Sequence, residues 1–416
     1  MRTFGHAKTV LSSDASDMPK AADLALVYEV PLDTLAVWET YRATPTLDAV
    51  NGGTKLSRGA EGNSSTLHRR AIPGGPYDMT GKWIKYSVYM WPGAGSDAGG
   101  ESPDRFSVFY VRLHTLTAGG WNTYTRVKLR HFYSAGDYFE GDRGLYTGWV
   151  HVDDSTDSAG NLASIDGISI DINTRANDDA CDCTIVSVEV FTPPATYVPP
   201  FAICSDDGFD TVLDLAALLE ARDLVATHYV LPGLISTTGQ YLGGETLATA
   251  AELRDLKQRL GHLIANHSWT HTAWDTLTAS QRRLEITRAA DWLTENGFAD
   301  GSRIFALPYG SFHWEIVDDV MLGVEADQVR LTNYKTPYHT EQGGPLVYAP
   351  IFVDVDGDFA AADQLLADCI AMKLPCILGF HNIADLTEAT LITFLDAVET
   401  ARDAGTIRVV TTDGMF

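Results

Sequence analysis

Two adjacent aspartates stand at the end of a short apolar run. Asp206 and Asp207 follow FAICS, residues 201–205, and Gly208 comes directly after them. Two ionised carboxylates side by side repel each other, so a buried strand is not expected to end in both without a positive partner. A metal ion relieves that repulsion, and a carboxylate beside it can accept a proton. The pair therefore indicates metal-assisted chemistry, although an Asp–Asp pair by itself is more often a helix N-cap.

Two histidines follow a later apolar run. The segment HLIANHSWTH, residues 262–271, ends in His267 and His271. A spacing of four residues lets both imidazoles face one point if the segment forms one helical turn. Two histidines and one carboxylate are a common open zinc set, which leaves room for water and substrate. One of the two aspartates would then be the metal ligand and the other would be free to take a proton.

The second half of the chain alternates short apolar strands with helical segments. The clearest helix spans 278–297, opens with a Thr278/Gln281 capping-box spacing and ends at Asn296-Gly297. Fully apolar strands between helices predict a distorted (β/α) barrel of about seven strands, whose site lies in the loops at the strand carboxyl ends. The expected strands are FAICS, THYVL, LIANH, IFALP, VRLTN, CILGFH and IRVVTT.

The first half reads as an all-β domain. Short strands with alternating polarity are separated by turns rich in Gly, Asp and Ser, and no helical period appears. This pattern predicts an N-terminal β-sandwich that resembles a jelly roll. The expected strands are 83–91, 105–113, 123–132, 166–172 and 184–191.

A change of sequence pattern sets the expected domain boundaries. Residues 193–200 contain four prolines and form a semi-rigid spacer. We therefore expect an N-terminal extension at 1–20, the β-sandwich at 21–192 and the barrel at 201–416, with the sandwich a candidate carbohydrate-binding module.

Composition limits the classes of partner. The chain has 416 residues, of which 45% are hydrophobic and 20% charged, and its formal net charge is −25. Such a charge argues against nucleic acid and against an anionic membrane surface. We expect no signal peptide and no membrane insertion, because no apolar run of the required length occurs. The five cysteines show no zinc-finger spacing and are expected mainly as buried thiols; they are Cys181, Cys183, Cys204, Cys369 and Cys376.

Residues from about 200 to 416 resemble the polysaccharide deacetylases of carbohydrate esterase family 4, the NodB-homology domains. The family's first motif, T/S-F-D-D-G, is matched by CSDDGF, which implies that Asp206 is the catalytic base and Asp207 a metal ligand. The second motif, H-S/T-x-x-H, is matched by HSWTH and implies that His267 and His271 are the other metal ligands.

The later motifs add two roles and two departures. ALPYG resembles the third motif, so the backbone N–H of Tyr309 is expected to hold the oxyanion, and LGFH places the catalytic acid at His381. The third-motif arginine that braces the base is Ala306 here, as in members with a FAYPYG-like third motif. The fourth motif, D-x-x-D-W, is not present as such. Its candidate aspartates are Asp354, Asp356 and Asp358.

The resemblance implies a hydrolase that removes N-acetyl or O-acetyl groups from a cell-surface or extracellular polysaccharide. One divalent metal ion, with zinc expected, and an acetylated polysaccharide are the implied cofactor and partner. The site of action is then extracellular or on a virion. The alternative is a catalytically weak or inactive glycan-binding protein, or a structural part of a phage tail or another particle that contacts cell-surface glycan.

Other aromatic and histidine residues have two interpretations each. A tryptophan near the site can line a sugar-binding groove or belong to the core, and core is the favoured interpretation for Trp269, Trp274 and Trp314. The same holds for a sugar platform in the first domain, whose candidates are Trp83, Trp91, Trp121 and Trp149. His228, which follows the second barrel strand, is expected to be structural.

Overall fold

The computed structural model leaves several segments of the chain undescribed. It describes residues 25–32, 39–41, 44–49, 52–58, 66–91, 106–116, 124–131, 144–152, 155–158, 161–174, 181–310, 326–330, 346–348, 351–352, 359–373, 375–386 and 388–415. Within these residues, no helix has both the length and the apolar character that a membrane span requires.

The chain divides into two compact units between Ala195 and Thr196. The last strand of the N-terminal unit ends at Thr192, and the first strand of the C-terminal unit begins at Pro200. The division therefore falls within the proline-rich segment.

The described residues of the N-terminal unit form two six-stranded antiparallel sheets. The first sheet has the order β3-β4-β12-β6-β9, with β1 paired to β12, and the second has the order β10-β8-β7-β11-β5-β2. All five expected strands are present as β6, β7, β8, β11 and β12; the jelly-roll topology stays a prediction. The strands are β1 (Ala25–Glu29), β2 (Glu39–Tyr41), β3 (Thr44–Leu47), β4 (Thr54–Arg58), β5 (Thr66–Ala71), β6 (Trp83–Trp91), β7 (Phe106–His114), β8 (Tyr124–His131), β9 (Gly144–His151), β10 (Ser155–Ser158), β11 (Gly167–Thr174) and β12 (Cys181–Thr192).

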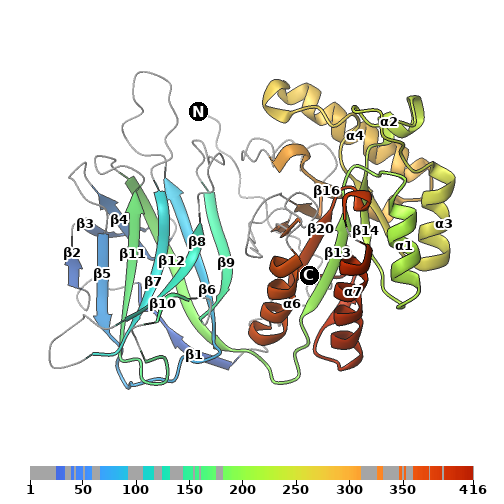
Figure 1. The fold of residues 1–416 in the computed structure, drawn as a ribbon. Helices are drawn as coiled ribbons and strands as arrows, with labels where there is room; N and C mark the ends of the chain where they lie inside the picture. Colours follow the sequence, from blue (N-terminus) through green and yellow to red (C-terminus); the bar gives the residue numbers. More distant parts are fainter. Residues whose placement is uncertain are drawn as a thin grey trace. The chain divides into compact units, whose positions relative to one another are not determined.

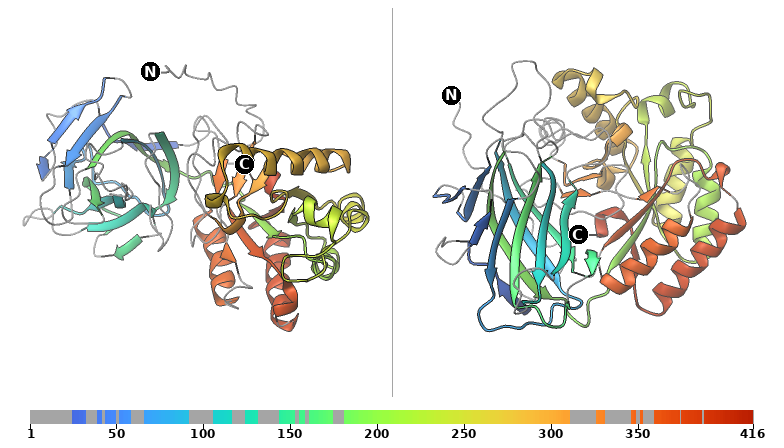
Figure 2. Two further views of the ribbon diagram at one scale, coloured as in Figure 1. Left: turned by 90° about the horizontal axis from the view of Figure 1, so that it is seen from above. Right: turned by 60° about the vertical axis from the view of Figure 1, so that its left-hand side comes forward.

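Both sheets contribute to one hydrophobic core. Ile84 and Val188 from the first sheet belong to the same buried cluster as Val111 and Ile170 from the second. The strands curve around this interior (Figure 2). Trp83 is fully buried, which supports its interpretation as core rather than sugar platform.

The C-terminal unit is built on one parallel sheet of nine strands among the described residues. Its order is β18-β17-β16-β15-β14-β13-β20-β19, with β21 also paired to β13. The described strands form no closed ring of pairs, so the sheet is an open, curled version of the expected barrel. The strands are β13 (Pro200–Ser205), β14 (Thr227–Val230), β15 (Leu263–Asn266), β16 (Ile304–Ala306), β17 (Gln328–Arg330), β18 (Leu346–Tyr348), β19 (Ile351–Phe352), β20 (Cys376–Phe380) and β21 (Arg408–Val410).

All seven expected strands are present, and two more occur. The additional strands, β18 and β19, are three and two residues long. The strands at the centre of the sheet are buried along their whole length, as expected for parallel strands covered on both faces.

Helices provide that cover. Buried side chains of α1, α6 and α7 form one cluster with β13 and β20, and those of α1, α3 and α4 form another with β14 and β15. Figure 1 shows these helices beside the strands of the sheet. The α-helices are α1 (Val212–Glu220), α2 (Pro232–Thr237), α3 (Ala250–Leu260), α4 (Ala279–Glu295), α6 (Phe359–Met372) and α7 (Glu388–Asp403). The 3₁₀ helices are η2 (Trp274–Thr276), η3 (Ala299–Gly301), η4 (Pro308–Gly310), η5 (Ile383–Asp385) and η6 (Thr412–Gly414).

Helix α4 confirms the expectation drawn from its capping residues. The Thr278 side chain accepts a hydrogen bond from the Gln281 backbone, and Gln281 bonds back to Thr278. The helix ends at Glu295, followed by Gly297 at φ 91°, a conformation that glycine adopts without steric cost. These local signals fix where the helix starts and stops.

Candidate metal centre and active site

The parallel order brings the carboxyl ends of six strands to one edge of the sheet. β13 lies beside β14 and β20, while β15, β16 and β17 follow in turn on the β14 side. The segments that leave these strands carry the two aspartates, the two histidines, the PYG turn and His381. Function-bearing loops of βα folds occupy this edge.

A sharp turn after β13 presents both aspartates. Asp206 and Asp207 are 1% and 4% exposed, and the Asp206 backbone N–H donates to the Phe380 carbonyl at 2.8 Å. Asp207 has φ 67° and Gly208 has φ 72°. A Cβ at Gly208 would approach the Val230 side chain to 3.1 Å, so glycine suits this turn on two counts.

The two histidines lie in an irregular loop, which corrects the expectation of a helical turn. Ser268 and His271 have φ 76° and 58°, a left-handed conformation that breaks any helix between 267 and 271. The rings of His267 and His271 are nevertheless 4.9 Å apart. Strained backbone of this kind persists where the surrounding structure enforces it, often at functional sites.

Hydrogen bonds hold this loop in place. The Asn266 side chain accepts from the Ser268 N–H at 2.9 Å, and Ser268 Oγ accepts from the His271 N–H at 3.1 Å. Glu285 of α4 accepts from both the backbone N–H and the hydroxyl of Thr270. The sequence pattern did not predict this bracing, because it depends on contacts with a helix that follows in the chain.

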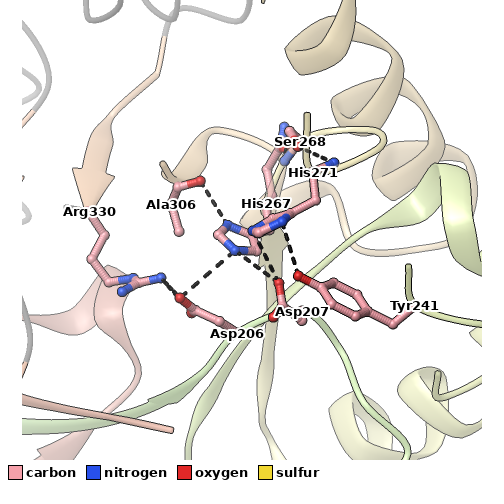
Figure 3. A network of polar contacts seen from close by, with 9 residues as sticks. Asp206, Asp207, Tyr241, His267, Ser268, His271, Ala306 and Arg330 are labelled. Atoms are coloured by element: carbon pink, nitrogen blue, oxygen red, sulfur yellow. Dashed lines mark hydrogen bonds and ion pairs between the residues drawn. The ribbon is translucent and has the colours of Figure 1, made fainter. Parts of the chain in front are cut away.

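Three ligand atoms converge on one point (Figure 3). Nε2 of His267 and Nε2 of His271 lie 3.4 and 3.3 Å from Oδ1 of Asp207, and the three atoms all lie within 4.8 Å of one another. Ligands ~2.0–2.2 Å from a tetrahedral ion are about 3.3–3.6 Å apart. No donor among the described residues reaches Asp207 Oδ1 with hydrogen-bond geometry, although that atom is buried. A buried carboxylate oxygen that accepts no hydrogen bond from these residues is what a metal ligand would look like before the ion binds.

The far side of each imidazole is also fixed. His267 Nδ1–H donates to the Ala306 carbonyl at 2.9 Å, and His271 Nδ1 lies 3.2 Å from the Tyr241 hydroxyl. Both rings therefore turn Nε2 towards Asp207, as ligating histidines do when an outer partner sets the tautomer. Tyr241 was not predicted, and nothing in its loop, GQYLGG, marks it in the sequence.

Charges within the site favour the ligand forms of these residues. Burial raises the pKa of Asp207, but its proximity to His267 and the charges of His271 and His381 outweigh that effect and bring the pKa below its usual value. Burial and then His267 lower the pKa of His271 to about 4, against an opposing effect of Asp207. A carboxylate and a neutral imidazole are the forms that bind a metal.

Arg330 is the residue that the sequence analysis missed. Its Nη2 donates to both carboxylate oxygens of Asp206, and both side chains are buried (Figure 3). Arg330 is paired in register with Ala306 on the neighbouring strand. The available signal was an arginine within an expected strand of the buried sheet, since arginine is almost never fully buried without a partner.

Tyr309 and His381 lie at the same edge. Tyr309 has φ 56°, is 56% exposed, and its ring is 4.4 Å from that of His271. His381 follows β20, is half-buried, and is close enough to affect the pKa of both Asp207 and His271. The catalytic roles of these two residues stay predictions.

Two tryptophans and one histidine that the sequence singled out have packing contacts or buried hydrogen bonds. Trp274 is fully buried and packs edge-on against Phe305, as core. Trp269 is half-buried and packs over Gly233, where a Cβ would come within 2.7 Å of its ring. His228 is buried between Ser205 Oγ at 2.7 Å and His262 at 3.0 Å, which supports its structural interpretation.

Several predicted residues lie outside the described positions. These are Trp121, Trp314, Asp354, Asp356 and Asp358, together with the side chains of Trp91, Trp149, Cys181 and Cys183. The other three cysteines are buried free thiols, as expected: Cys204, Cys369 and Cys376.

Comparisons with known proteins identify a similar family and several similar proteins. Residues 196–323 match the family model described as polysaccharide deacetylase. An uncharacterised 30.6 kDa protein from Geobacillus stearothermophilus is 29% identical over 112 residues, which cover 26% of this chain and 37% of that protein. The chain thus spans little more than a third of the length of that relative.

Solved structures show a weaker likeness. A family 4 carbohydrate esterase from Streptomyces lividans, in complex with acetate, is 17% identical and covers 52% of this chain and 91% of its own, with a TM-score of 0.35. A family 4 acetyl xylan esterase from Clostridium thermocellum, in complex with a cobalt ion, is 19% identical and covers 52% and 90%, with a TM-score of 0.35.

Proposed function

We propose that this chain, which carries a polysaccharide deacetylase domain over residues 196–323, is a metal-dependent hydrolase that removes N-acetyl or O-acetyl groups from a polysaccharide. One observation carries the proposal: Asp207 Oδ1 faces Nε2 of His267 and of His271 at 3.3–3.4 Å, with a second carboxylate adjacent. The expected ion is zinc, which suits a site of two nitrogens and one oxygen.

The residues of the site divide the reaction between them. A bound divalent ion would supply Lewis acidity, which polarises the acetyl carbonyl and makes water more acidic. Asp206 accepts a proton from the water that attacks the carbonyl carbon. The backbone N–H of Tyr309 donates to the developing oxyanion, an interaction whose loss typically costs about 10²–10³ in rate.

His381 completes the reaction as a general acid. It donates a proton to the sugar nitrogen, or to the oxygen in an ester, as the bond from that atom to the carbonyl carbon breaks. The products are acetate and a glycan with a free amine or hydroxyl. A substrate of this class places the site of action outside the cell or on a virion.

Acetate release tests this proposal. Zinc-loaded protein is incubated with N-acetylated chitooligosaccharide, peptidoglycan and acetylated xylan, and acetate is measured enzymatically. Release from at least one substrate, lost in Asp206→Asn, supports a deacetylase. No release from any acetylated glycan by fully loaded protein would favour a glycan-binding protein without catalytic activity.

A further inference from the structure

Both aspartates have a carboxylate oxygen near His267 Nε2. Asp207 Oδ1 is 3.4 Å from His267 Nε2, and Asp206 Oδ2 is 3.8 Å from the same nitrogen. Asp206 lies outside the group of three converging ligand atoms, so its side chain would have to turn towards both histidines to become a ligand. Carboxylates bind divalent metals readily, so some feature of the protein must decide which of the two becomes the ligand.

The two carboxylates differ in their partners. Arg330 donates to both oxygens of Asp206, whereas Oδ1 of Asp207 receives no hydrogen bond from the described residues. A guanidinium that holds a carboxylate in this way fixes its position and uses lone pairs that a metal would otherwise accept. Asp207 is left with a free oxygen directed at both imidazoles.

Arg330 is itself held rigidly. It is fully buried at the end of β17, and its Cζ lies 4.6 Å from the centre of the Tyr229 ring. The Tyr229 hydroxyl donates to Thr412 Oγ1 at 3.1 Å. A cation stacked on an aromatic ring and paired with a carboxylate has little freedom to move away.

We propose that Arg330 is a positioning residue that keeps Asp206 out of the metal's coordination shell and thereby assigns the metal to Asp207. The inference rests on the proposed metal site. It also explains how the chain tolerates Ala306: the two residues are register partners on adjacent parallel strands, so the cation is supplied by the next strand.

A double-variant cycle on zinc affinity tests the assignment. Chelator-treated protein is titrated with zinc in competition with a chromophoric chelator, for wild type, Asp207→Asn, Arg330→Met and the double variant. In the wild-type background, Asp207→Asn should weaken zinc binding by about 100-fold or more, because a first ligand is lost. In the Arg330→Met background, Asp207→Asn should weaken zinc binding by less than about 10-fold, because the released Asp206 replaces the missing ligand.

Two further variants control for charge and for folding. Arg330→Lys keeps a cation but presents a compact ammonium instead of a planar guanidinium. In this background, the loss of zinc affinity caused by Asp207→Asn should lie between the losses in the wild-type and Arg330→Met backgrounds. If Arg330→Met does not fold, the same comparison is made with Arg330→Lys. Arg303→Met removes an exposed arginine paired at 2.8 Å with Asp327, which precedes β17. In this background, Asp207→Asn should weaken zinc binding as much as it does in the wild type.

The outcomes separate this inference from the proposed function. If Asp207→Asn weakened zinc binding by the same factor in all backgrounds, Arg330 would not have the proposed role. Unchanged zinc binding in the Asp207→Asn single variant would also contradict that role. The cycle does not depend on acetate release. A protein that bound zinc as described but hydrolysed no acetylated glycan would contradict the proposed function and still support the assignment by Arg330.

Discussion

Neighbouring aspartates have different surroundings although they are joined by one peptide bond. Asp206 faces Arg330, while Asp207 faces the two imidazoles. Asp207 has a left-handed backbone, and the two aspartate side chains point in different directions (Figure 3). Different partners, rather than different residue types, therefore separate a proton acceptor from a metal ligand.

Replacing each aspartate by asparagine should separate these roles. We expect Asp206→Asn to keep zinc and to lose about 10²–10⁴-fold in the rate of acetate release, because an amide cannot accept the proton. Asp207→Asn should lose zinc affinity as well as activity. Bound zinc and initial rates are measured on the same preparations. Loss of zinc in Asp206→Asn but not in Asp207→Asn would reverse the assignment.

Tyr241 is expected to support His271 as a ligand. With Nε2 directed at Asp207, Nδ1 of His271 carries the proton and donates it to the Tyr241 hydroxyl 3.2 Å away. Tyr241→Phe should therefore weaken zinc binding by about 10-fold, in the range that outer partners of metal ligands contribute. Competition titration measures the change.

The matched control removes a tyrosine hydroxyl far from this site in the chain. Tyr77→Phe deletes a hydroxyl that donates to the Pro73 carbonyl in the N-terminal unit, and it should leave zinc affinity unchanged. Equal affinities for wild type, Tyr241→Phe and Tyr77→Phe would show that the Tyr241 hydroxyl does not support the ligand.

At the level of elements, the sequence identified what depends on local pattern. The apolar runs gave seven strands of the parallel sheet, and the Thr278/Gln281 spacing gave the start of α4. The sequence pattern also placed Asp207, His267 and His271 at strand ends that the fold brings together. Parallel strands carry this information, because their carboxyl ends necessarily share one edge.

Contacts between distant elements were not predictable in the same way. The loop at 267–271 is irregular because Asn266, Ser268 and Glu285 satisfy its backbone groups, and no periodicity encodes such a shape. Arg330 pairs with a residue 124 positions earlier. Single-sequence patterns report neighbours along one element, so the partner of a buried charge remains hidden until the strand order is known.

The buried pair formed by His228 and His262 should make stability depend on pH. Burial lowers the pKa of His262 to about 4, with a further lowering by Arg259 and an opposing effect of Glu220. Burial, followed by His262, also brings the pKa of His228 well below 6.5. Folded-state values below the unfolded value mean that the unfolded chain binds more protons, so stability is full above pH 6.5 and falls towards pH 4.

Replacing one histidine isolates this contribution. For His262 the loss between pH 6.5 and 4 is on the order of 2–3 kcal/mol, at ~1.4 kcal/mol per pKa unit. His262→Phe should be less stable at pH 7 but show a shallower decline with acid, as measured by urea unfolding across this range. Parallel pH curves for the two proteins would exclude the pair as a source of acid sensitivity.

For the molecule as a whole, the division near Thr196 suggests separate tasks. Each unit has its own hydrophobic cluster, and each sheet is complete within one unit. Units with separate cores commonly fold alone. We propose that the C-terminal unit performs the hydrolysis and that the N-terminal unit binds the glycan polymer.

A shortened chain that starts at Thr196 tests this division. It should be folded and should release acetate from a short acetylated oligosaccharide at a rate close to that of the full chain. On a long polymer it should be slower, because a binding unit raises the local substrate concentration. Rates on short and long forms of one glycan are compared at saturating zinc. Equal losses on both forms would indicate that the N-terminal unit completes the active site.

We propose that Asp207, His267 and His271 together hold one ion that the hydrolysis requires. The most direct test is to remove metal with a chelator, add zinc back in steps, and measure acetate release from an acetylated glycan at each step. We expect no acetate release from the metal-free protein and full recovery at one equivalent of zinc, with no recovery in Asp207→Asn. Undiminished acetate release from metal-free protein would contradict it.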